Sequence, residues 1–221
     1  MIIKWFGQSC FMITSENGTK VLTDPFKKML GYKLPQIIDA DIVSVSHNHS
    51  DHNNINAVKS NFVCINELGL FSKNGIEIKG VETFHDKVSG SKRGKNTVYN
   101  FKIDGINICH CGDLGHLLNS KQIEEIGIVD ILLLPIGGTA TINAFDATKV
   151  LKQLKPTIVI PMHYRTKALG LPGCLLFGTV DKFISVSGLK AKEYEKLELN
   201  KTNMKDYSGI VVLKYNYDSH L

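Results

Sequence analysis

This chain of 221 residues lacks the features of membrane and exported proteins. No apolar run approaches the roughly 20 residues that a membrane-spanning helix requires. The opening residues Met1 to Phe6 enter strand-like sequence at once, without the basic region, apolar region and cleavage site of a signal peptide. We therefore expect a cytoplasmic protein that does not bind a membrane.

Cysteine and clustered positive charge are also scarce. The five cysteines are odd in number and scattered, and they form no Cys-x-x-Cys pair, so we expect reduced thiols that pack as small apolar groups. The net charge is +5, and the longest basic cluster, Lys92-Arg93-Gly94-Lys95, has the size that a solvated loop carries. Nucleic-acid binding is therefore not indicated.

The composition that is present is ordinary for a globular protein, with 43% hydrophobic and 21% charged residues. The length suits one domain with a sizeable core, so we expect residues 1–221 to fold as a single domain. Strand patterns dominate the first half of the chain, and strands alternate with helices in the second half. This order predicts an α/β fold in which two sheets are in contact and helices cover their outer faces.

Turn and capping signals place several elements. Asn17-Gly18 predicts a hairpin between residues 5–14 and 20–22, because both turn residues tolerate positive φ. Asn119 with Gln122 predicts a capped helix that ends at Ile126, and Asn143 predicts the start of another. The remaining predicted elements are strands at 42–46, 62–65, 75–79, 81–84, 97–103, 106–111, 130–134, 157–160 and 210–215, and helices at 54–59, 144–154 and 180–186.

The chain is organised around a cluster of three histidines and one aspartate within the six positions from His47 to His52. The cluster follows the apolar run Ile42 to Val45, which is typical of a buried strand, so it lies where that strand ends. Neutral imidazoles and carboxylates are the ligands that zinc and similar divalent metals prefer. His47 and His49 point the same way on an extended backbone, whereas Asp51 and His52 fall beyond the strand end and are free to turn toward a second ion. The cluster predicts a metal site.

A two-metal hydrolase needs about three protein ligands for each ion and one shared ligand, so about three more are expected at nearby strand ends. His85, Asp113 and His163 each follow an apolar strand directly. Gly112 would let the backbone approach the ions closely at Asp113. Each residue is weak evidence alone, and the combination is far more specific.

The order His-x-His-x-Asp-His, then His85, Asp113 and His163, resembles the signature of the metallo-β-lactamase fold superfamily. The resemblance covers most of the chain and implies a four-layered αβ/βα sandwich of two mixed β-sheets. Further segments resemble one branch of the superfamily, which contains uncharacterised cytosolic zinc-dependent hydrolases and is similar to L-ascorbate 6-phosphate lactonase. These segments are residues 7–11, 22–26, 112–115, 134–138 and 160–164.

The resemblance also implies the cofactor and its ligands. Two divalent ions are expected, zinc first, with manganese, iron or nickel as alternatives, and a homo-oligomer is compatible because relatives in the lactonase branch oligomerise. One ion would be bound by His47, His49 and His85, the other by Asp51, His52 and His163, and Asp113 would bridge them. Gln8 stands where many relatives carry a histidine, and Gln8 and His110 are expected to lie behind the ligands rather than on the metal.

Such a centre would supply a bound hydroxide that attacks a carbonyl carbon or a phosphorus, and it would stabilise the resulting oxyanion. Asp51 is the predicted catalytic residue, as a proton shuttle. The loop 137–141, with Thr139 and Thr141, suits a phosphate or carboxylate, although a packing role explains it equally well. Tyr164 and Arg165, and a lid carrying Lys92, Arg93 and Lys95, also favour an anionic small-molecule substrate.

The sequence therefore predicts a metal-dependent hydrolase of a small anionic ester, either a lactone or a phosphodiester. A nuclease is one alternative. The sequence argues against it, because it lacks a tract of aromatic and basic residues that would bind single-stranded nucleic acid. An iron-dependent redox or binding protein is another, but its relatives carry an attached flavin or rubredoxin-like domain. A non-catalytic, metal-binding member of the superfamily is the last alternative, and such members usually lose ligands.

Overall fold

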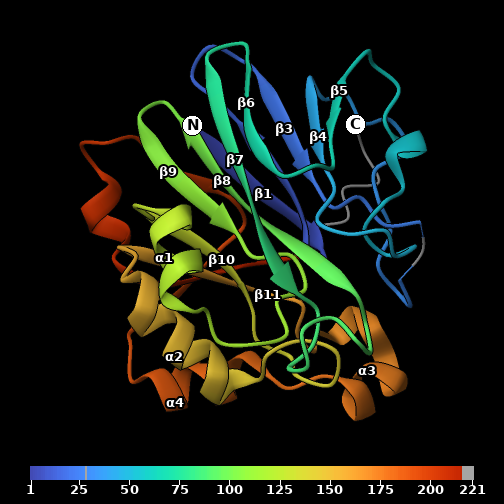
Figure 1. Ribbon diagram of the computed structural model, residues 1–221, viewed down its shortest axis with the longest axis vertical. Coiled ribbons are helices and arrows are strands. Elements are labelled where there is room, and N and C mark those ends of the chain that lie inside the picture. The colour runs from blue at the N-terminus through green and yellow to red at the C-terminus, as the bar shows by residue number, and fades with distance from the viewer. Residues whose placement is uncertain (28, 216–221) are drawn as a thin grey trace.

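The computed structural model describes residues 1–27 and 29–215, which form two mixed β-sheets packed against each other (Figure 1). The first sheet has the strand order β13-β1-β2-β3-β4-β5. Its strands are β1 (Ile2–Gly7), β2 (Cys10–Thr14), β3 (Lys20–Thr23), β4 (Ile42–Ser44), β5 (Val63–Ile65) and β13 (Leu197–Glu198). The pairs from β13 to β3 are antiparallel, and β3, β4 and β5 are parallel.

The second sheet has the order β12-β14-β11-β10-β9-β8-β7-β6. Its strands are β6 (Gly69–Lys73), β7 (Ile76–Phe84), β8 (Lys95–Ile103), β9 (Ile106–His110), β10 (Ile131–Pro135), β11 (Ile158–Met162), β12 (Ala191–Tyr194) and β14 (Gly209–Leu213). The neighbouring strands from β12 to β9 are parallel, and those from β9 to β6 are antiparallel. Every residue of β10 and β11 is buried, as expected for central parallel strands that are covered on both faces.

Two of the α-helices pack against the second sheet. The α-helices are α1 (Ser120–Ile126), α2 (Ala144–Leu154), α3 (Gly170–Leu176) and α4 (Val180–Ser187), and the 3-10 helices are η1 (Ile55–Ala57), η2 (Lys167–Leu169) and η3 (Met204–Tyr207). α1 contacts β7 and β8, α2 contacts β10, and α4 packs on α2. In Figure 1, α1, α2 and α4 gather on one side and α3 lies apart at the lower right. The two mixed sheets with four α-helices confirm the predicted fold class.

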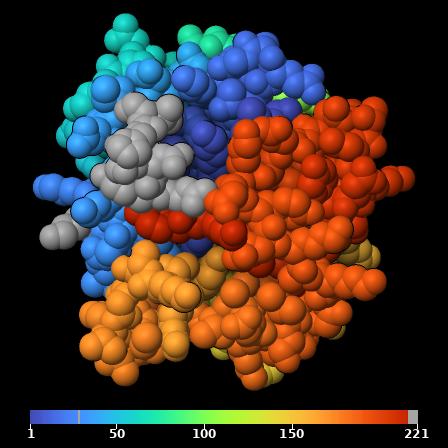
Figure 2. Space-filling view, turned by 180° about the vertical axis from the view of Figure 1, so that it is seen from behind, coloured from blue at the N-terminus to red at the C-terminus, as the bar shows by residue number. Residues whose placement is uncertain are grey.

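One hydrophobic core joins the two sheets. It includes Phe11 and Ile42 from the first sheet and Val98 and Phe101 from the second. Hydrogen bonds also cross between the sheets, as from the Tyr99 hydroxyl to the Val45 carbonyl at 3.3 Å. The N-terminal and C-terminal segments share the rear surface, in blue and in orange to red (Figure 2).

The local predictions succeed where a side chain fixes a boundary. Asn119 and Gln122 form the predicted capping box of α1, and the Asn143 side chain caps α2. The prediction of one continuous strand over residues 5–14 is wrong. Gly7 and Gln8 adopt positive φ and turn the chain between β1 and β2. The two strands predicted at 75–84 are one strand, β7. The elements β6, β12, β13 and α3 were not predicted.

Within residues 1–27 and 29–215, no single helix has the length and apolar character needed to cross a membrane. The segment Lys167–Leu176 and α4 reach that length and hydropathy only as a pair, which is bent by 66°.

Candidate metal centre

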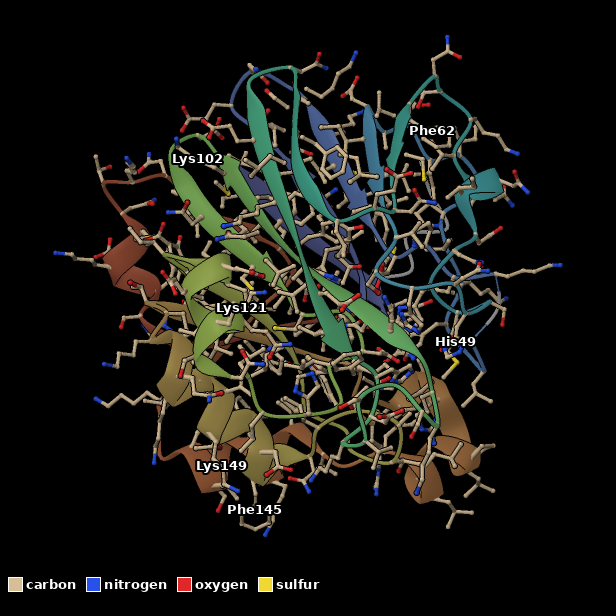
Figure 3. The ribbon with its side chains drawn as sticks, viewed as in Figure 1. His49, Phe62, Lys102, Lys121, Phe145 and Lys149 are labelled. Carbon is tan, nitrogen blue, oxygen red and sulfur yellow. The ribbon has the colours of Figure 1, made fainter. Side chains whose placement is uncertain are left out.

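The seven predicted ligands come from four places in the chain, each just beyond the end of a strand. His47, His49, Asp51 and His52 lie on the loop that follows β4. His85 follows β7 directly, Asp113 lies three residues after β9, and His163 follows β11 directly. Figure 3 shows His49 close to the level at which β7 ends. The fold therefore brings these distant segments to one edge of the two sheets.

The carboxylate of Asp113 lies at the centre of this group. Its Oδ2 atom is 3.3 Å from the Nε2 atoms of His52, His85 and His163. Three triads have ligand atoms within 4.8 Å of one another, namely His47-His49-His85, His47-His52-Asp113 and Asp51-His52-His163. Two of them correspond to the two three-residue groups expected from the sequence, and Asp113 lies against members of both.

The donor set fits a metal ion. The Nε2 atom of His52 is buried, and although Oδ2 of Asp113 lies 3.3 Å away, among the described residues this nitrogen makes no hydrogen bond of good geometry. A buried polar atom without a partner is costly, and a cation would satisfy it. Imidazole nitrogens and carboxylate oxygens are also the donors that zinc prefers. These residues therefore suit a divalent metal.

Asp24 orients one histidine in each of the two predicted ligand groups. Its Oδ2 atom accepts hydrogen bonds from Nδ1 of His52 at 2.8 Å and from the Ser46 hydroxyl at 2.6 Å. Because the Ser46 hydroxyl donates to this carboxylate, its oxygen accepts from Nδ1 of His47 at 3.0 Å. Both histidines are thus held with a proton on Nδ1 and a lone pair on Nε2, which is the form that binds a metal.

The charges within the centre already compensate one another. Burial opposes ionisation of Asp113, but the nearby His163 and His52 hold the pKa of this carboxyl well below 3.8. Burial alone would lower the pKa of His52, yet Asp113 and Asp24 raise it well above 6.5. Burial lowers the pKa of His47 to about 3 and also lowers that of His85. A metal ion bound at this centre would therefore compete with a proton on His52.

A close backbone approach positions Asp113. Gly112 has a φ of +52°, and a Cβ atom there would lie 2.4 Å from Oδ1 of Asn96 and 2.6 Å from Cβ of Ser46. The same Asn96 Oδ1 accepts a hydrogen bond from the Asp113 backbone N–H at 2.9 Å. The Asn96 amide nitrogen donates to Thr83 at 2.8 Å and to the Cys111 carbonyl at 3.0 Å. Only glycine fits at 112, and the buried Asn96 connects β7, β8 and the loop that carries Asp113.

Gln8 and His110 lie behind the ligands. The Gln8 amide donates to Oδ2 of Asp51 at 3.4 Å, and the Gln8 carbonyl accepts from the His163 backbone N–H at 3.2 Å. His110 is fully buried, and its Nε2 atom lies 2.8 Å from the Ser9 carbonyl. Both residues therefore support neighbouring loops and are absent from the three triads.

The residues predicted to bind substrate are placed less favourably. The Thr139 hydroxyl donates to the Leu176 carbonyl, and the Thr141 hydroxyl lies 3.3 Å from the Ile142 carbonyl. Backbone N–H groups at 138, 140, 141 and 142 also donate to carbonyls of the chain, so this loop is better explained by packing than by anion binding. Tyr164 is 5% exposed and its ring stacks on Trp5 at 5.3 Å, which assigns it to the core. Arg165 is exposed next to His163.

Sequence reasoning missed Asp24 and Asn96. In the sequence, Asp24 stands out only as part of the segment 22–26 that resembles one branch of the superfamily, yet this buried carboxylate is the partner of His52. Its position beside Ser46 depends on the parallel pairing of β3 with β4, in which Thr23 lies opposite Ser44. A charged residue directly after a buried strand, as at Asp24, is the signal that would have identified it.

The chain is similar to one known family and to proteins that carry a related name. The family described as "Beta-lactamase superfamily domain" matches residues 2–163. A solved structure from Thermotoga maritima, assigned to the zinc-dependent hydrolases of the metallo-β-lactamase superfamily, is 39% identical with a TM-score of 0.80 and covers 96% of this chain and 97% of its own. The UPF0173 metal-dependent hydrolase of Archaeoglobus fulgidus is 30% identical, with 75% of this chain and 84% of the relative covered. The corresponding protein of Thermoplasma volcanium is 34% identical, with 74% and 83% covered.

Proposed function

The chain belongs to the β-lactamase superfamily and is a metal-dependent hydrolase, and we propose that it cleaves a small anionic ester, a lactone or a phosphodiester, at a centre of two divalent ions. The observation that carries the proposal is the position of Asp113. One carboxylate oxygen lies 3.3 Å from imidazole nitrogens that arrive from the His47–His52 loop, from the end of β7 and from the end of β11. A carboxylate shared in this way suits a ligand that bridges two ions.

We assign the ligands by their proximity. His47, His49 and His85 would hold one ion, Asp51, His52 and His163 the other, and Asp113 both. Zinc is the metal that five imidazoles and two carboxylates favour, and manganese, iron and nickel are the alternatives. When bound, such ions lower the pKa of a coordinated water and stabilise negative charge that develops on the scissile group.

The residues of the chain supply orientation and proton transfer. Asp24 and Ser46 fix the tautomers of His52 and His47, so that each presents a lone pair to the centre. The Asp51 side chain is 28% exposed and lies 3.6 Å from Nε2 of His52. Because it reaches both solvent and the centre, Asp51 is the residue that would hold a proton and deliver it to the leaving group. Gln8 donates to Asp51 at 3.4 Å and restricts its rotation.

The test combines metal content with activity. Elemental analysis of the purified protein should give about two equivalents of a transition metal, and Asp113→Ala should lose metal together with chelator-sensitive hydrolysis of lactones and of bis(4-nitrophenyl) phosphate. Asp51→Asn should lower turnover more than it lowers folding stability. Asp130→Ala is the matched control, because that carboxylate binds Asn107 at the opposite ends of β9 and β10.

Three outcomes would redirect the proposal. A wild-type protein that contains no metal and takes up neither zinc nor manganese would overturn the ligand assignment. Chelator-sensitive cleavage of generic RNA or DNA, without hydrolysis of small esters, would assign a nuclease instead. Two bound ions without any hydrolysis would favour the non-catalytic alternative.

A further inference from the structure

A cavity of about 430 Å³ adjoins the exposed side of the metal centre. His47 and His49 form part of its wall, and the segments around Glu67, Glu82 and Arg93 form the rest. A cavity of this size suits a small molecule. Because two predicted metal ligands line it, a molecule bound there would place one end at the metal centre.

The charged side chains of this cavity leave one cation without an ion pair. Lys95 is paired with Glu82 at 2.6 Å, so these two charges largely cancel. Among the described residues, neither the Arg93 guanidinium nor the Glu67 carboxylate forms an ion pair, although both line the cavity. Arg93 belongs to the loop that joins β7 to β8, in which the Gly94 carbonyl accepts a hydrogen bond from the backbone N–H of His85 at 3.1 Å. The cavity therefore has one positive and one negative side chain outside its ion pair, on a wall shared with two predicted metal ligands.

Asp86 holds the loop that presents Arg93. Its Oδ1 atom accepts hydrogen bonds from the backbone N–H groups of Val88 and Gly90, both at 2.8 Å. Its Oδ2 atom accepts from those of Lys92 at 2.9 Å and Arg93 at 2.8 Å. These hydrogen bonds fix the backbone of the loop, and so they also fix the point from which the Arg93 side chain extends.

We propose that Arg93 is the specificity-determining residue of this cavity, and that its guanidinium binds a carboxylate or phosphate group of the substrate while the scissile bond lies at the metal centre. Guanidinium groups match such anions because they donate two parallel hydrogen bonds. Glu67, which also lines the cavity, would repel a second anionic group and accept a hydrogen bond from a hydroxyl or ammonium group. The inference rests on the proposed function and narrows its substrate to molecules that carry an anionic group close to the bond that is cleaved.

The test uses two hydroxamates of equal length that bind a metal at one end. Glutaric acid monohydroxamate carries a carboxylate at its other end, and pentanohydroxamate carries a methyl group there. Calorimetry on the metal-loaded protein should show that wild type prefers the carboxylate probe by about tenfold or more. Arg93→Ala should abolish this preference and leave the affinity for pentanohydroxamate unchanged, and Arg93→Lys should retain part of it. Lys92→Ala is the matched control, because Lys92 is the neighbouring exposed cation, is anchored by the same carboxylate, and does not line the cavity.

The outcomes separate this inference from the function on which it rests. Equal preference in Arg93→Ala and Lys92→Ala, or no preference in wild type, would overturn the role of Arg93 while leaving the metal-dependent hydrolase intact. Failure of both probes to bind wild type, together with absence of metal by elemental analysis, would overturn the metal centre and the inference with it. Metal content is measured for every variant, so that a loss of binding is not mistaken for a loss of the ions.

Discussion

The two halves of the metal centre differ in how their histidines are supported. In one half His52 is buried, and its Nδ1 atom lies 2.8 Å from the buried carboxylate of Asp24. In the other half the imidazole of His49 is exposed and bonds to another ligand, His47, at 2.9 Å. His52 is thus oriented by a buried carboxylate of the fold, whereas His49 depends more on the metal. The cavity that we propose binds the substrate lies on the side of His49.

The variant with the largest expected effect on this comparison is Asp24→Asn. The amide would retain one oxygen, but it would place N–H donors against the Nδ1 hydrogen of His52 or against Ser46, and so disturb histidines of both halves. We expect metal affinity to fall by about 10- to 100-fold for both ions. Ser46→Ala should weaken the ion beside His47 and leave the other nearly unchanged, because His52 keeps its own bond to Asp24. Competition with a chromogenic chelator measures both affinities, and equal effects of the two variants would contradict the separation of the halves.

The next test concerns Gly112, which brings Asp113 between the two halves. Gly112→Ala would introduce a Cβ atom 2.4 Å from Asn96 at a φ of +52°, so we expect a loss of about 1–3 kcal/mol in the free energy of unfolding and lower metal content. Gly188→Ala is the control, since Gly188 also has a positive φ, +69°, in the left-handed region but has no atom within 4 Å of the added Cβ. Urea unfolding in the presence of chelator should show a larger loss for the first variant. Only Gly112→Ala should lose metal.

A smaller effect is expected at His110, a buried histidine that the metal does not need. Its Nε2–H donates to the Ser9 carbonyl, and its Nδ1 accepts from the Gly112 backbone N–H at 3.3 Å, so both nitrogens are used by the neutral ring. Burial accordingly lowers the pKa of His110 below 6.5. The stability that this provides is fully present above pH 6.5 and declines as the pH falls below 6.5, because the unfolded chain takes up a proton that the folded chain refuses.

The measurement for His110 is the pH dependence of unfolding in chelator. Between pH 6.5 and 4, the free energy of unfolding of wild type should fall more steeply than that of His110→Gln, by at most about 1.4 kcal/mol per pH unit. Asp24 and Asp113, whose pKa values are lowered from 3.8, add their own loss only below that pH in both proteins. Parallel curves for the two proteins would show that His110 titrates normally in the folded state.

The predicted metal ligands are easier to recognise in the sequence than the residues that support them. His47 and His49 are recognisable because they belong to a dense cluster of ligand residues after an apolar run, and His85 and His163 because each follows an apolar strand. Asp24 and Asn96 act across strand pairs, through the registers of β3 with β4 and of β7 with β8. Register depends on tertiary packing, so the sequence alone could not show which side chains these residues would meet.

The same limit explains the substrate residues. Tyr164 directly follows a predicted ligand, and its aromatic ring and hydroxyl suited a substrate contact as well as a core position. Its ring stacks on Trp5, which belongs to a strand of the other sheet. Arg93 was visible only as part of a basic loop, because the cavity beside it is formed by segments from several strands. A side chain near the site in sequence is therefore weaker evidence than one that the fold brings there.

The smallest expected effect is at the loop 137–141. We expect this loop to lie near the metal centre without binding the substrate. The Thr139 hydroxyl donates to the Leu176 carbonyl, and the neighbouring backbone donors are used within the chain, so little remains to bind an anion. Thr139→Ala should change the kcat/KM of an anionic ester by less than about twofold, while the free energy of unfolding falls by about 1 kcal/mol for the lost hydrogen bond. Steady-state kinetics beside Arg93→Ala measures the contrast. A rise of tenfold or more in KM for Thr139→Ala, with metal content unchanged, would return this loop to the substrate site.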